Sequence, residues 1–310
     1  MAIIHCDKAE RVADILPPES VQTVVTSPPY YGLRDYGVEG QIGLEATPEE
    51  YVAKLVEVFR GIRQVLRPDG TVWLNLGDSY NGSGGAGGDY NEGGLKEGQP
   101  RYPGRRVEGL KPKDLIGIPW RVAFALQADG WYLRSDIIWH KPNPMPESVT
   151  DRPTKAHEYI FLLTKNPRYY YDAEAIAEPA VTTDPRKTTF RRTGGKMTAL
   201  DVPGQAQSSH RDDRKDTPPR ETRNRRSVWT INTSRFPEAH FATFPERLPE
   251  LCILAGSRPG DLVLDPFVGS GTTLLVAERL GRRAVGTEIN PEYIEIAKRR
   301  LSRVQLAMSL

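Results

Sequence analysis

The sequence of 310 residues predicts an α/β fold with a doubly wound, mostly parallel sheet. Short apolar segments of strand composition alternate with longer amphipathic segments of helical periodicity. The alternation stops at a polar, basic stretch and resumes after it, so the two flanking parts are expected to share one sheet. Hydrophobic residues make up 38% of the chain, enough for a full core, and the mean hydropathy of −0.51 indicates a strongly polar surface.

The first 80 residues alternate between strands and helices. The clearest helix begins after Thr47, an N-cap residue that is followed by Pro48 at the first position and Glu50 at the capping-box position. Its apolar face continues to Leu66, and Gly70 follows its expected end. The other elements expected here are strands at 2–6, 21–27 and 71–76 and a short helix at 8–16.

Residues 77–110 interrupt this alternation with a glycine-rich loop. A loop of this length is typical of either a functional lid or a flexible segment, and both interpretations stay open. Regular structure resumes with a helix at 118–128 and strands at 135–140 and 158–164. Strands are then expected at 227–231, 261–267 and 283–289, with helices at 245–255, 271–280 and from Pro291, which Asn290 caps.

The chain is expected to have three parts. Residues 1–171 and 227–310 form two parts of one α/β domain, and residues 172–226 form an insertion between them. Residues 181–226 include twelve Lys or Arg and six Asp or Glu, a net charge of +6, which leaves −4 for the remainder. A basic segment on a mildly acidic body is typical of nucleic-acid binding, although a solvated loop has the same composition.

Several classes of protein are not expected. No apolar run approaches the roughly 18 residues of a membrane span, and the N-terminus lacks a secretion signal, so a cytoplasmic protein without a membrane partner is expected. The two cysteines, Cys6 and Cys252, make neither a disulfide framework nor a metal-ligand spacing. The five histidines include no pair at i and i+4, so no metal is expected.

The segment "LVLDPFVGSGTTLLVAERL" runs from an apolar strand through a glycine turn into a helix. Nucleotide-like ligands bind at such a place, where glycines admit the ligand and the helix N-terminus offers N–H groups. There is no P-loop lysine, and Leu274 stands at the third glycine position of the dinucleotide fingerprint. A tight turn without a ligand would explain the glycines alone, but Glu288 at the end of the next strand is placed to accept hydrogen bonds from ribose hydroxyls.

Two phrases, "DPFVGSGTT" with Glu288 and "TSPPY", resemble the S-adenosylmethionine motif and the catalytic motif of the amino-group DNA methyltransferases. The catalytic motif comes first and the basic segment lies between the two, an order that resembles the β class with its circularly permuted, Rossmann-like sheet. The similarity covers nearly the whole chain. It implies S-adenosylmethionine as the cofactor, S-adenosylhomocysteine as its product, no metal, and double-stranded DNA as the substrate.

The resemblance also implies roles for individual residues. It places cofactor contacts at Asp7, Thr243, Phe244, Asp265, Pro266, Phe267, Gly269, Ser270, Gly271, Thr272, Glu288 and Asn290. Asp7 would meet the adenine amino group, and residues 172–226 would recognise the target sequence. DNA contacts are expected from Arg223, Arg225 and Arg226 of the basic segment and from Arg152, which could instead pair with Asp151 or Glu158.

The catalytic motif comprises Ser27, Pro28, Pro29 and Tyr30. Methyl transfer to an exocyclic amine requires hydrogen-bond acceptors, which draw the amine lone pair out of conjugation with the base ring. Ser27 Oγ and the Pro28 carbonyl can accept, while both prolines lack an N–H and fix φ near −65°. Preorganised acceptors need little reorganisation in the transition state. Tyr30 is expected to stack on a base flipped out of the duplex.

Ser27 favours cytosine N4 as the target, because family members with Ser-Pro-Pro-Tyr usually act there. Adenine N6 enzymes usually have Asp or Asn at this position and remain the alternative. Cytosine C5 chemistry is disfavoured, since neither cysteine follows a proline in a catalytic-looking loop. Methylation of protein or RNA and non-catalytic DNA binding are further alternatives, although the first reverses the motif order and the second leaves the cofactor motif unexplained.

Other side chains have two interpretations each. Trp139 and Lys141 would line the base pocket, although Trp139 equally suits the core. Asp78 and Tyr80 follow a strand whose end should face the site, and tyrosines 169–171 suit packing better than base stacking. The resemblance is compatible with a monomer or a homodimer and with a cognate restriction endonuclease as a partner.

Overall fold

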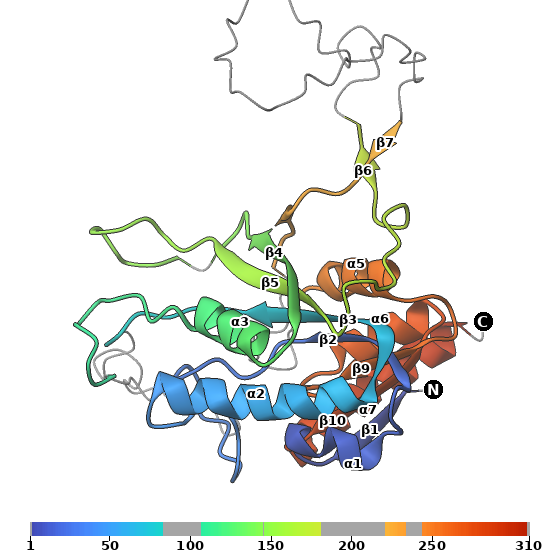
Figure 1. Ribbon diagram of the computed structural model, residues 1–310, viewed down its shortest axis with the longest axis horizontal. Helices are drawn as coiled ribbons and strands as arrows, with labels where there is room; N and C mark the ends of the chain where they lie inside the picture. Colours follow the sequence, from blue (N-terminus) through green and yellow to red (C-terminus); the bar gives the residue numbers. More distant parts are fainter. Residues whose placement is uncertain (1, 83–106, 145, 181–220, 234–243, 309–310) are drawn as a thin grey trace, which may run out of the picture. The chain divides into compact units, whose positions relative to one another are not determined.

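The computed structural model describes residues 2–82, 107–144, 146–180, 221–233 and 244–308, with side chains up to residue 302. The chain forms two compact units. Met1–Ala175 and Arg226–Leu310 make up the first, and Ile176–Arg225 make up the second. The first unit contains the main sheet and its helices (Figure 1).

An eight-stranded sheet with the order β1-β10-β9-β2-β3-β5-β4-β8 forms the centre of the first unit. Its strands are β1 (Ile3–Cys6), β2 (Val21–Thr26), β3 (Leu66–Leu76), β4 (Tyr132–His140), β5 (His157–Thr164), β8 (Val228–Thr230), β9 (Leu262–Asp265) and β10 (Arg283–Glu288). All neighbours are parallel except the two antiparallel pairs that β5 makes with β3 and β4. The predicted mostly parallel α/β fold is therefore confirmed, and strands from both ends of the chain share the sheet.

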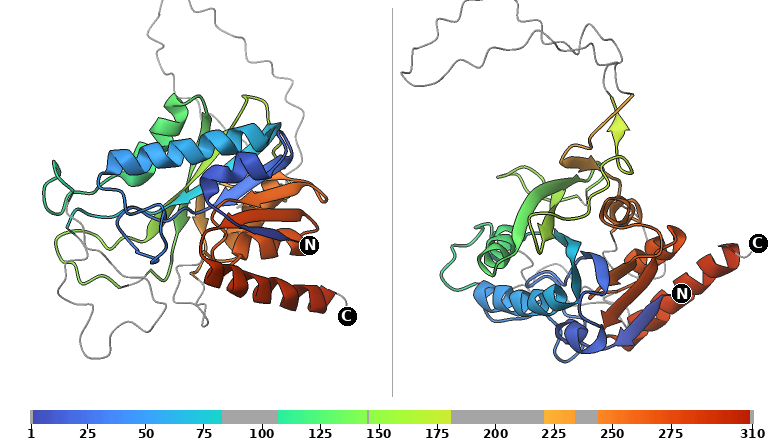
Figure 2. Two further views of the ribbon diagram at one scale, coloured as in Figure 1. Left: turned by 90° about the horizontal axis from the view of Figure 1, so that it is seen from below. Right: turned by 45° about the vertical axis from the view of Figure 1, so that its right-hand side comes forward.

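Helices cover both faces of this sheet. They are the 3₁₀ helix η1 (Ala9–Arg11) and the α-helices α1 (Val12–Ile15), α2 (Pro48–Val65), α3 (Ile118–Ala128), α5 (Arg247–Gly256), α6 (Thr272–Arg279) and α7 (Pro291–Met308). Helix α2 contacts α1 and α3, and α6 contacts α5 and α7. The light-blue α2 and the red α7 lie on opposite faces, as Figure 2 shows. No described helix is long and apolar enough to span a membrane.

The start of α2 follows the prediction, but its end does not. Thr47 Oγ1 accepts from the Glu50 N–H at 3.1 Å, and Glu50 Oε2 accepts from the Thr47 N–H at 3.2 Å, which completes the capping box. The helix ends at Val65, and β3 begins directly at Leu66 rather than at residue 71. Leu66 pairs with Val21 before an irregular stretch, and regular pairing with β2 resumes only at Thr71. Gly70 lies in that stretch and therefore does not mark the end of the helix.

The second unit corresponds to most of the expected insertion at 172–226. Its described part is a two-residue antiparallel ribbon of β6 (Glu178–Pro179) and β7 (Thr222–Arg223). Residues 181–220, with most of the basic side chains, lie outside the described part of the chain. The role of this unit in target recognition therefore remains a prediction.

A buried carboxylate joins the strands that precede the two motifs. Asp265, the last residue of β9, is 2% exposed. Its Oδ1 accepts hydrogen bonds from Thr26 Oγ1 at 2.7 Å and from the Phe267 N–H at 3.0 Å. Since Thr26 ends β2, the contact ties together the ends of two neighbouring strands. Burial raises the pKa of Asp265 from 3.8 to about 7, although its hydrogen bonds act in the opposite direction.

A glycine allows the turn after β9 to approach β10. A Cβ atom at Gly286 would lie 2.3 Å from Val268 Cγ2 and 2.4 Å from the Asp265 carbonyl oxygen. The second neighbour is backbone and cannot rotate away. At Gly61, inside α2, the nearest atom to an added Cβ would be 3.6 Å away, an ordinary contact.

We expect Asp265 to lower the stability of the protein as the pH rises. Its folded pKa of about 7 exceeds its ordinary value of 3.8, so between these values the folded protein holds more protons than the unfolded chain. The free energy of unfolding should therefore fall across this window. Urea denaturation at several pH values should show that the free energy of unfolding of Asp265→Asn declines less with rising pH, because asparagine does not titrate. Equal declines in both proteins would contradict this origin of the slope.

Gly286→Ala should destabilise the protein by roughly 1–3 kcal/mol, because the new methyl group overlaps backbone. Gly61→Ala is the matched control and should be neutral or stabilising by about 0.5–1 kcal/mol, since alanine favours the helix interior more than glycine does. Urea denaturation at one pH measures both. A Gly286→Ala protein as stable as the unmodified one would show that the turn can move away from β10.

Candidate active site

The candidate site lies at the edge of the sheet where its parallel strands end. Asp7 follows β1, Ser27 follows β2, Pro266 follows β9, and Glu288 is the last residue of β10. The carboxyl ends of parallel strands meet at one edge, which is where open α/β sheets bind ligands. A cavity of about 320 Å³ opens there, and all four residues line it. Its size is that of a small-molecule site.

One half of the cavity is lined by residues of the predicted cofactor set. These are Asp7, Phe244, Pro266, Phe267, Gly269, Ser270, Thr272, Glu288 and Asn290. Asp265 and Gly271 are not among the described residues that line the cavity, and Thr243 lies outside the described part. Asp265 instead supports the turn from within the sheet through its bonds to Thr26 and Phe267.

The glycine turn is held by the last helix. Gly271 precedes α6 with a φ of +81°, and a Cβ atom there would lie 2.9 Å from the Ala297 Cβ, so both conformation and space require glycine. Arg300 Nη1 donates to the Ser270 carbonyl at 2.7 Å, to Ser270 Oγ at 2.8 Å and to Thr272 Oγ1 at 3.0 Å. No sequence pattern points to Arg300 as a site residue, because it lies in a run of charged residues on a helix.

Glu288 is hydrogen-bonded to the backbone on both sides of the cavity rim. Its Oε2 accepts from the Gly269 N–H at 2.8 Å, and its Oε1 accepts from the Asn290 N–H at 2.9 Å. Burial raises the pKa of Glu288, while these hydrogen bonds oppose the rise. Each carboxylate oxygen has a further lone pair. Glu288 can therefore accept hydrogen bonds from hydroxyl groups in the cavity while it holds the glycine turn.

Residues 33–42, directly after the catalytic motif, also line the cavity and were missed in the sequence. The lining includes Leu33, Arg34, Tyr36, Gly40, Gln41 and Ile42. Gln41 fixes this segment, because its Oε1 accepts from the Tyr36 N–H at 2.8 Å and its Nε2 donates to the Arg34 carbonyl at 3.1 Å. The Tyr36 ring meets Tyr293 of α7 edge-on, with centroids 6.0 Å apart. The segment thus bridges the two motifs across the cavity.

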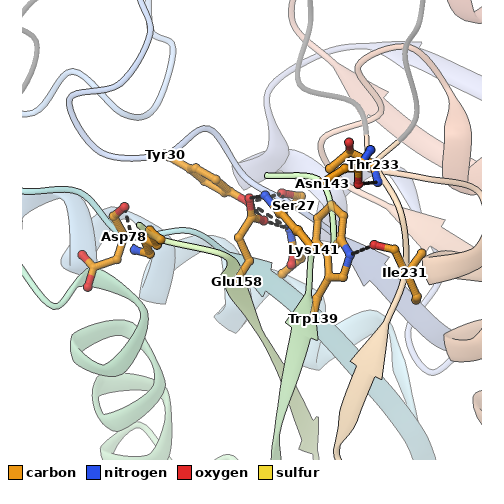
Figure 3. Close-up of polar contacts among 11 residues, drawn as sticks. Ser27, Tyr30, Asp78, Trp139, Lys141, Asn143, Glu158, Ile231 and Thr233 are labelled. Carbon is orange, nitrogen blue, oxygen red and sulfur yellow. Dashed lines mark hydrogen bonds and ion pairs between the residues drawn. The ribbon is translucent and has the colours of Figure 1, made fainter. Parts of the chain in front are cut away.

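The other half of the cavity contains the predicted catalytic motif and a polar cluster that the sequence did not reveal (Figure 3). Tyr30 Oη donates to Glu158 Oε2 at 2.6 Å. Asn75 Nδ2 donates to Tyr30 Oη and to Glu158 Oε2, both at 2.8 Å, and lies 3.3 Å from Ser27 Oγ. Lys141 Nζ pairs with Glu158 Oε1. The cluster therefore combines Asn75 of β3, Glu158 of β5 and Lys141, which directly follows β4.

Tyr30 is more constrained than a free stacking ring would be. Burial, followed by the Glu158 carboxylate, raises the pKa of Tyr30 well above its ordinary value, so the hydroxyl keeps its proton at neutral pH. A Cβ atom at Gly77 would lie 2.5 Å from Tyr30 Cε2, so part of the ring packs on backbone. The ring still lines the cavity, and its stacking on a base remains a prediction.

The two proline carbonyls differ in their surroundings. Tyr51 Oη, from α2, donates to the Pro29 carbonyl at 2.8 Å, and this side chain is fully buried. Among the described residues, no hydrogen bond to the Pro28 carbonyl is found, and Pro28 lines the cavity. Helix α2 thus holds the motif through the Pro29 carbonyl, and the expected role of the Pro28 carbonyl as an acceptor for the amine stays a prediction.

Trp139 lines the cavity and belongs to the packed interior at the same time. It is 3% exposed, and its Nε1 donates to the Ile231 carbonyl at 2.9 Å. Lys141 Nζ lies 4.4 Å from the centroid of its ring, a cation–π contact. Thr233 follows on the same segment as Ile231, and its N–H donates to Asn143 Oδ1 at 3.1 Å. Core packing of Trp139 is therefore confirmed and the ring also lines the cavity, while its contact with a target base stays a prediction.

Arg152 makes neither of the expected ion pairs. Its Nη1 donates to Glu147 Oε2 at 2.7 Å, and its guanidinium lies 4.0 Å from the centroid of the Tyr80 ring. Asp151 pairs with Lys113, and Glu158 pairs with Lys141. The expected ion pairs of Arg152 with Asp151 or Glu158 do not form, because each of these carboxylates pairs with a lysine instead. A phosphate contact by Arg152 is left untested.

Asp78 supports helix α3 instead of facing the site. Its Oδ1 accepts from the Gly117 N–H at 3.0 Å and the Ile118 N–H at 3.1 Å, at the start of α3. The Asp78 backbone carbonyl contacts the loop before β5, where Lys155 Nζ donates to it at 2.8 Å.

Tyrosines 169–171 make packing contacts rather than a strand. Tyr171 stacks on Trp73 with centroids 6.3 Å apart, and Tyr170 lies under Arg258.

The three arginines predicted to contact DNA fall at the boundary of the two units. Within the second unit, Arg223 Nε donates to Glu178 Oε1 at 2.8 Å, and Arg225 Nε donates to the Ile176 carbonyl at 2.7 Å. Arg226 is exposed in the first unit, where its carbonyl accepts from Trp229 Nε1 at 2.9 Å.

No group of three or more potential metal ligands occurs among the residues that the structure describes.

Known proteins resemble this chain over almost its whole length. The N6_N4_Mtase family of DNA methylases matches residues 21–299. Type II methyltransferase M.SmaI of Serratia marcescens is 50% identical over 304 residues, which are 97% of this chain and 90% of that protein. Type II methyltransferase M.Cfr9I of Citrobacter freundii is 49% identical over 92% of this chain and 83% of that protein.

Solved structures of lower identity share the fold. The PvuII DNA methyltransferase, described as cytosine-N4-specific, superposes with a TM-score of 0.64 at 20% identity, over 96% of this chain and 86% of that one. TTHA0409 of Thermus thermophilus, whose structure was solved in complex with S-adenosylmethionine, has a TM-score of 0.60 at 24% identity, over 98% of this chain and 94% of that one. By the family match over residues 21–299 and the identity to the two Type II methyltransferases, this chain belongs to the N6_N4 family of DNA methylases.

Proposed function

We propose that this DNA methylase transfers a methyl group from S-adenosylmethionine to the N4 amine of a cytosine flipped out of double-stranded DNA. The observation that supports this most directly is one cavity lined by both Ser27 and Glu288. The site combines acceptors for an amine at one end with a carboxylate and a glycine turn for a nucleoside at the other. A flipped base enters such an enzyme through an open cavity.

The cofactor half fits S-adenosylmethionine by the chemistry of its donors and acceptors. Glu288 offers carboxylate oxygens for ribose hydroxyls, and Asp7 lines the cavity at the adjacent strand end, where an amino group of the adenine would find an acceptor. The N-terminus of α6 offers unpaired N–H groups to the methionine carboxylate. The cofactor supplies an electrophilic methyl group on a sulfonium.

The catalytic half receives the amine. Ser27 Oγ and the Pro28 carbonyl accept hydrogen bonds from the N–H groups of the amine. These bonds direct the nitrogen lone pair toward the methyl group. Fixed acceptors of this kind act mainly in the transition state, since they are already oriented before the reaction. Tyr30 and Trp139 supply apolar ring surface for the base, and both line the same cavity.

Adenine N6 is the alternative target, since the same acceptors suit any exocyclic amine. Ser27 favours cytosine N4, because the resembling enzymes with adenine specificity usually have Asp or Asn there. The Type II relatives suggest that this chain also protects a site against a cognate restriction endonuclease.

Incubation of unmethylated bacterial DNA with the protein and S-adenosylmethionine tests the proposal. After digestion to nucleosides, mass spectrometry should detect N4-methylcytosine. N6-methyladenine as the product would establish the alternative target. DNA without any methylated base would overturn the proposed activity.

We also expect Arg223 and Arg225 of the second unit, together with Arg226, to contribute to DNA binding. Replacing Arg223, Arg225 and Arg226 with Gln should weaken binding at low salt and reduce the slope of log affinity against log salt by up to about 0.9 for each lost phosphate contact. Fluorescence anisotropy with a labelled duplex at four salt concentrations measures the slope. A control with the same charge change replaces exposed cations on the helices, Lys54, Arg247 and Lys298. If both triple variants show the same slope of log affinity against log salt, Arg223, Arg225 and Arg226 make no phosphate contact.

A further inference from the structure

The acceptor role of Ser27 requires a hydroxyl with a defined direction. A serine hydroxyl has one hydrogen and two lone pairs, so it can donate into the cavity as readily as it can accept from it. A carboxylate at this position would have no such ambiguity, because it only accepts. An enzyme that uses serine to receive an amine therefore needs a neighbour that takes the serine hydrogen away from the substrate.

The hydrogen-bond chain beside Ser27 supplies that neighbour. Tyr30 Oη lies 2.6 Å from Glu158 Oε2, and its single hydrogen must lie on this bond because an ionised carboxylate has none to offer. Toward Ser27, 3.4 Å away, the Tyr30 oxygen can then only accept. The hydrogen of Ser27 consequently points at Tyr30, and the chain runs in one direction from serine to tyrosine to glutamate.

The remaining neighbours of Glu158 maintain this direction. Lys141 Nζ is paired with Oε1 and can only donate, and its side chain is 19% exposed. Asn75 Nδ2, 2.8 Å from Oε2, is also a donor, as is the same amide toward Ser27 Oγ at 3.3 Å. All three neighbours donate to Glu158, so its carboxylate is the acceptor at the end of the chain.

We propose that Glu158 is a positioning residue that, through Tyr30, turns the Ser27 hydroxyl into a pure acceptor for the target amine. The two hydrogens of the Asn75 amide lie on its nearer acceptors, Tyr30 Oη and Glu158 Oε2, both at 2.8 Å. The amide approaches Ser27 Oγ only at 3.3 Å, so Ser27 has a lone pair left for the amine. This inference rests on the proposed function, and it assigns to Glu158, Tyr30 and Asn75 a task that the amine-binding motif alone does not perform. Glu158 does not touch the reacting atoms.

The principal variant is Glu158→Gln. A glutamine at this place would offer its carbonyl to Lys141 and its amide hydrogens to Tyr30, which reverses the chain and leaves the Ser27 hydrogen directed into the cavity. Single-turnover transfer of a radiolabelled methyl group, at saturating S-adenosylmethionine and DNA, should slow roughly 10- to 100-fold, the scale of losing one preorganised hydrogen bond at a reacting group. The dissociation constant for S-adenosylmethionine should change less than about 2-fold, because Glu158 lies in the other half of the cavity. Tyr30→Phe keeps the ring, breaks the same chain and should slow transfer to a similar degree.

Matched controls remove the same groups elsewhere. Tyr31→Phe deletes the hydroxyl of the next residue, which donates to the Ala46 carbonyl at 3.2 Å. Glu49→Gln deletes a carboxylate paired with Arg121 on the helices. Both proteins should transfer the methyl group at the unmodified rate.

A double-mutant cycle with Ser27→Ala separates positioning from general damage. Ser27→Ala alone should reduce the transfer rate far more than it reduces cofactor affinity. If Glu158 acts through the Ser27 hydroxyl, adding Glu158→Gln to Ser27→Ala should slow transfer by less than about 2-fold, since no hydroxyl is left to orient. The same should hold for Tyr30→Phe in the Ser27→Ala protein.

Multiplicative losses in the double variants would overturn the inference, as would an unmodified rate in Glu158→Gln or Tyr30→Phe. If Glu158→Gln does not fold, because Lys141 loses its charged partner, the Tyr30→Phe cycle decides. The unmodified protein is assayed in parallel. If it methylates adenine, the cytosine assignment fails while the cycle is still measured on that base. If it methylates nothing, the proposed function itself fails.

Discussion

The site depends on one hydrogen bond between two strand ends, from Thr26 Oγ1 to Asp265 Oδ1. These residues are 239 positions apart in the sequence, yet they terminate the neighbouring strands β2 and β9. The catalytic motif begins one residue after Thr26, and the glycine turn begins at Gly269, four residues after Asp265. Joining the two strand ends therefore helps to hold the catalytic motif and the glycine turn at a defined separation. Burial of the Asp265 carboxyl is a thermodynamic cost of this arrangement, as the raised pKa indicates.

The parts of the site that could be predicted from the sequence are those encoded locally. The glycine turn, the proline pair and Glu288 lie within short segments whose composition needs a specific backbone, such as the positive φ of Gly271. The strand and helix pattern predicted the parallel sheet for the same reason, and the order of parallel strand ends then brought these segments to one edge. The end of α2 was misjudged because Gly70 resembles a helix stop, whereas the long-range pairing of Leu66 with Val21 begins the strand earlier.

Asn75, Glu158 and the direction of Lys141 could not be predicted, because they depend on strand register. Glu158 reaches Tyr30 only because β5 runs antiparallel between β3 and β4 and pairs Leu76 with Tyr159 and Trp139 with Glu158. A shift of one residue would turn Glu158 to the opposite face of the sheet. Arg300 and the segment at 33–42 likewise reach the cavity through tertiary contacts without a local pattern.

A half-buried ion pair such as Lys141–Glu158 is weak evidence of stabilisation, since desolvation of both charges offsets much of their attraction. An apolar pair of similar volume would fill the same space, but it would leave Tyr30 Oη and Asn75 Nδ2 without the acceptor that both now share. The Lys141–Glu158 pair therefore matters more for the orientation of Tyr30 and Asn75 than for the stability of the fold. An ionised carboxylate in the catalytic motif could only accept from an amine, whereas a serine hydroxyl can also donate and needs a neighbouring acceptor to take its hydrogen. Ser27, Lys141 and Glu158 thus act together, although Ser27 follows β2, Lys141 follows β4 and Glu158 lies in β5.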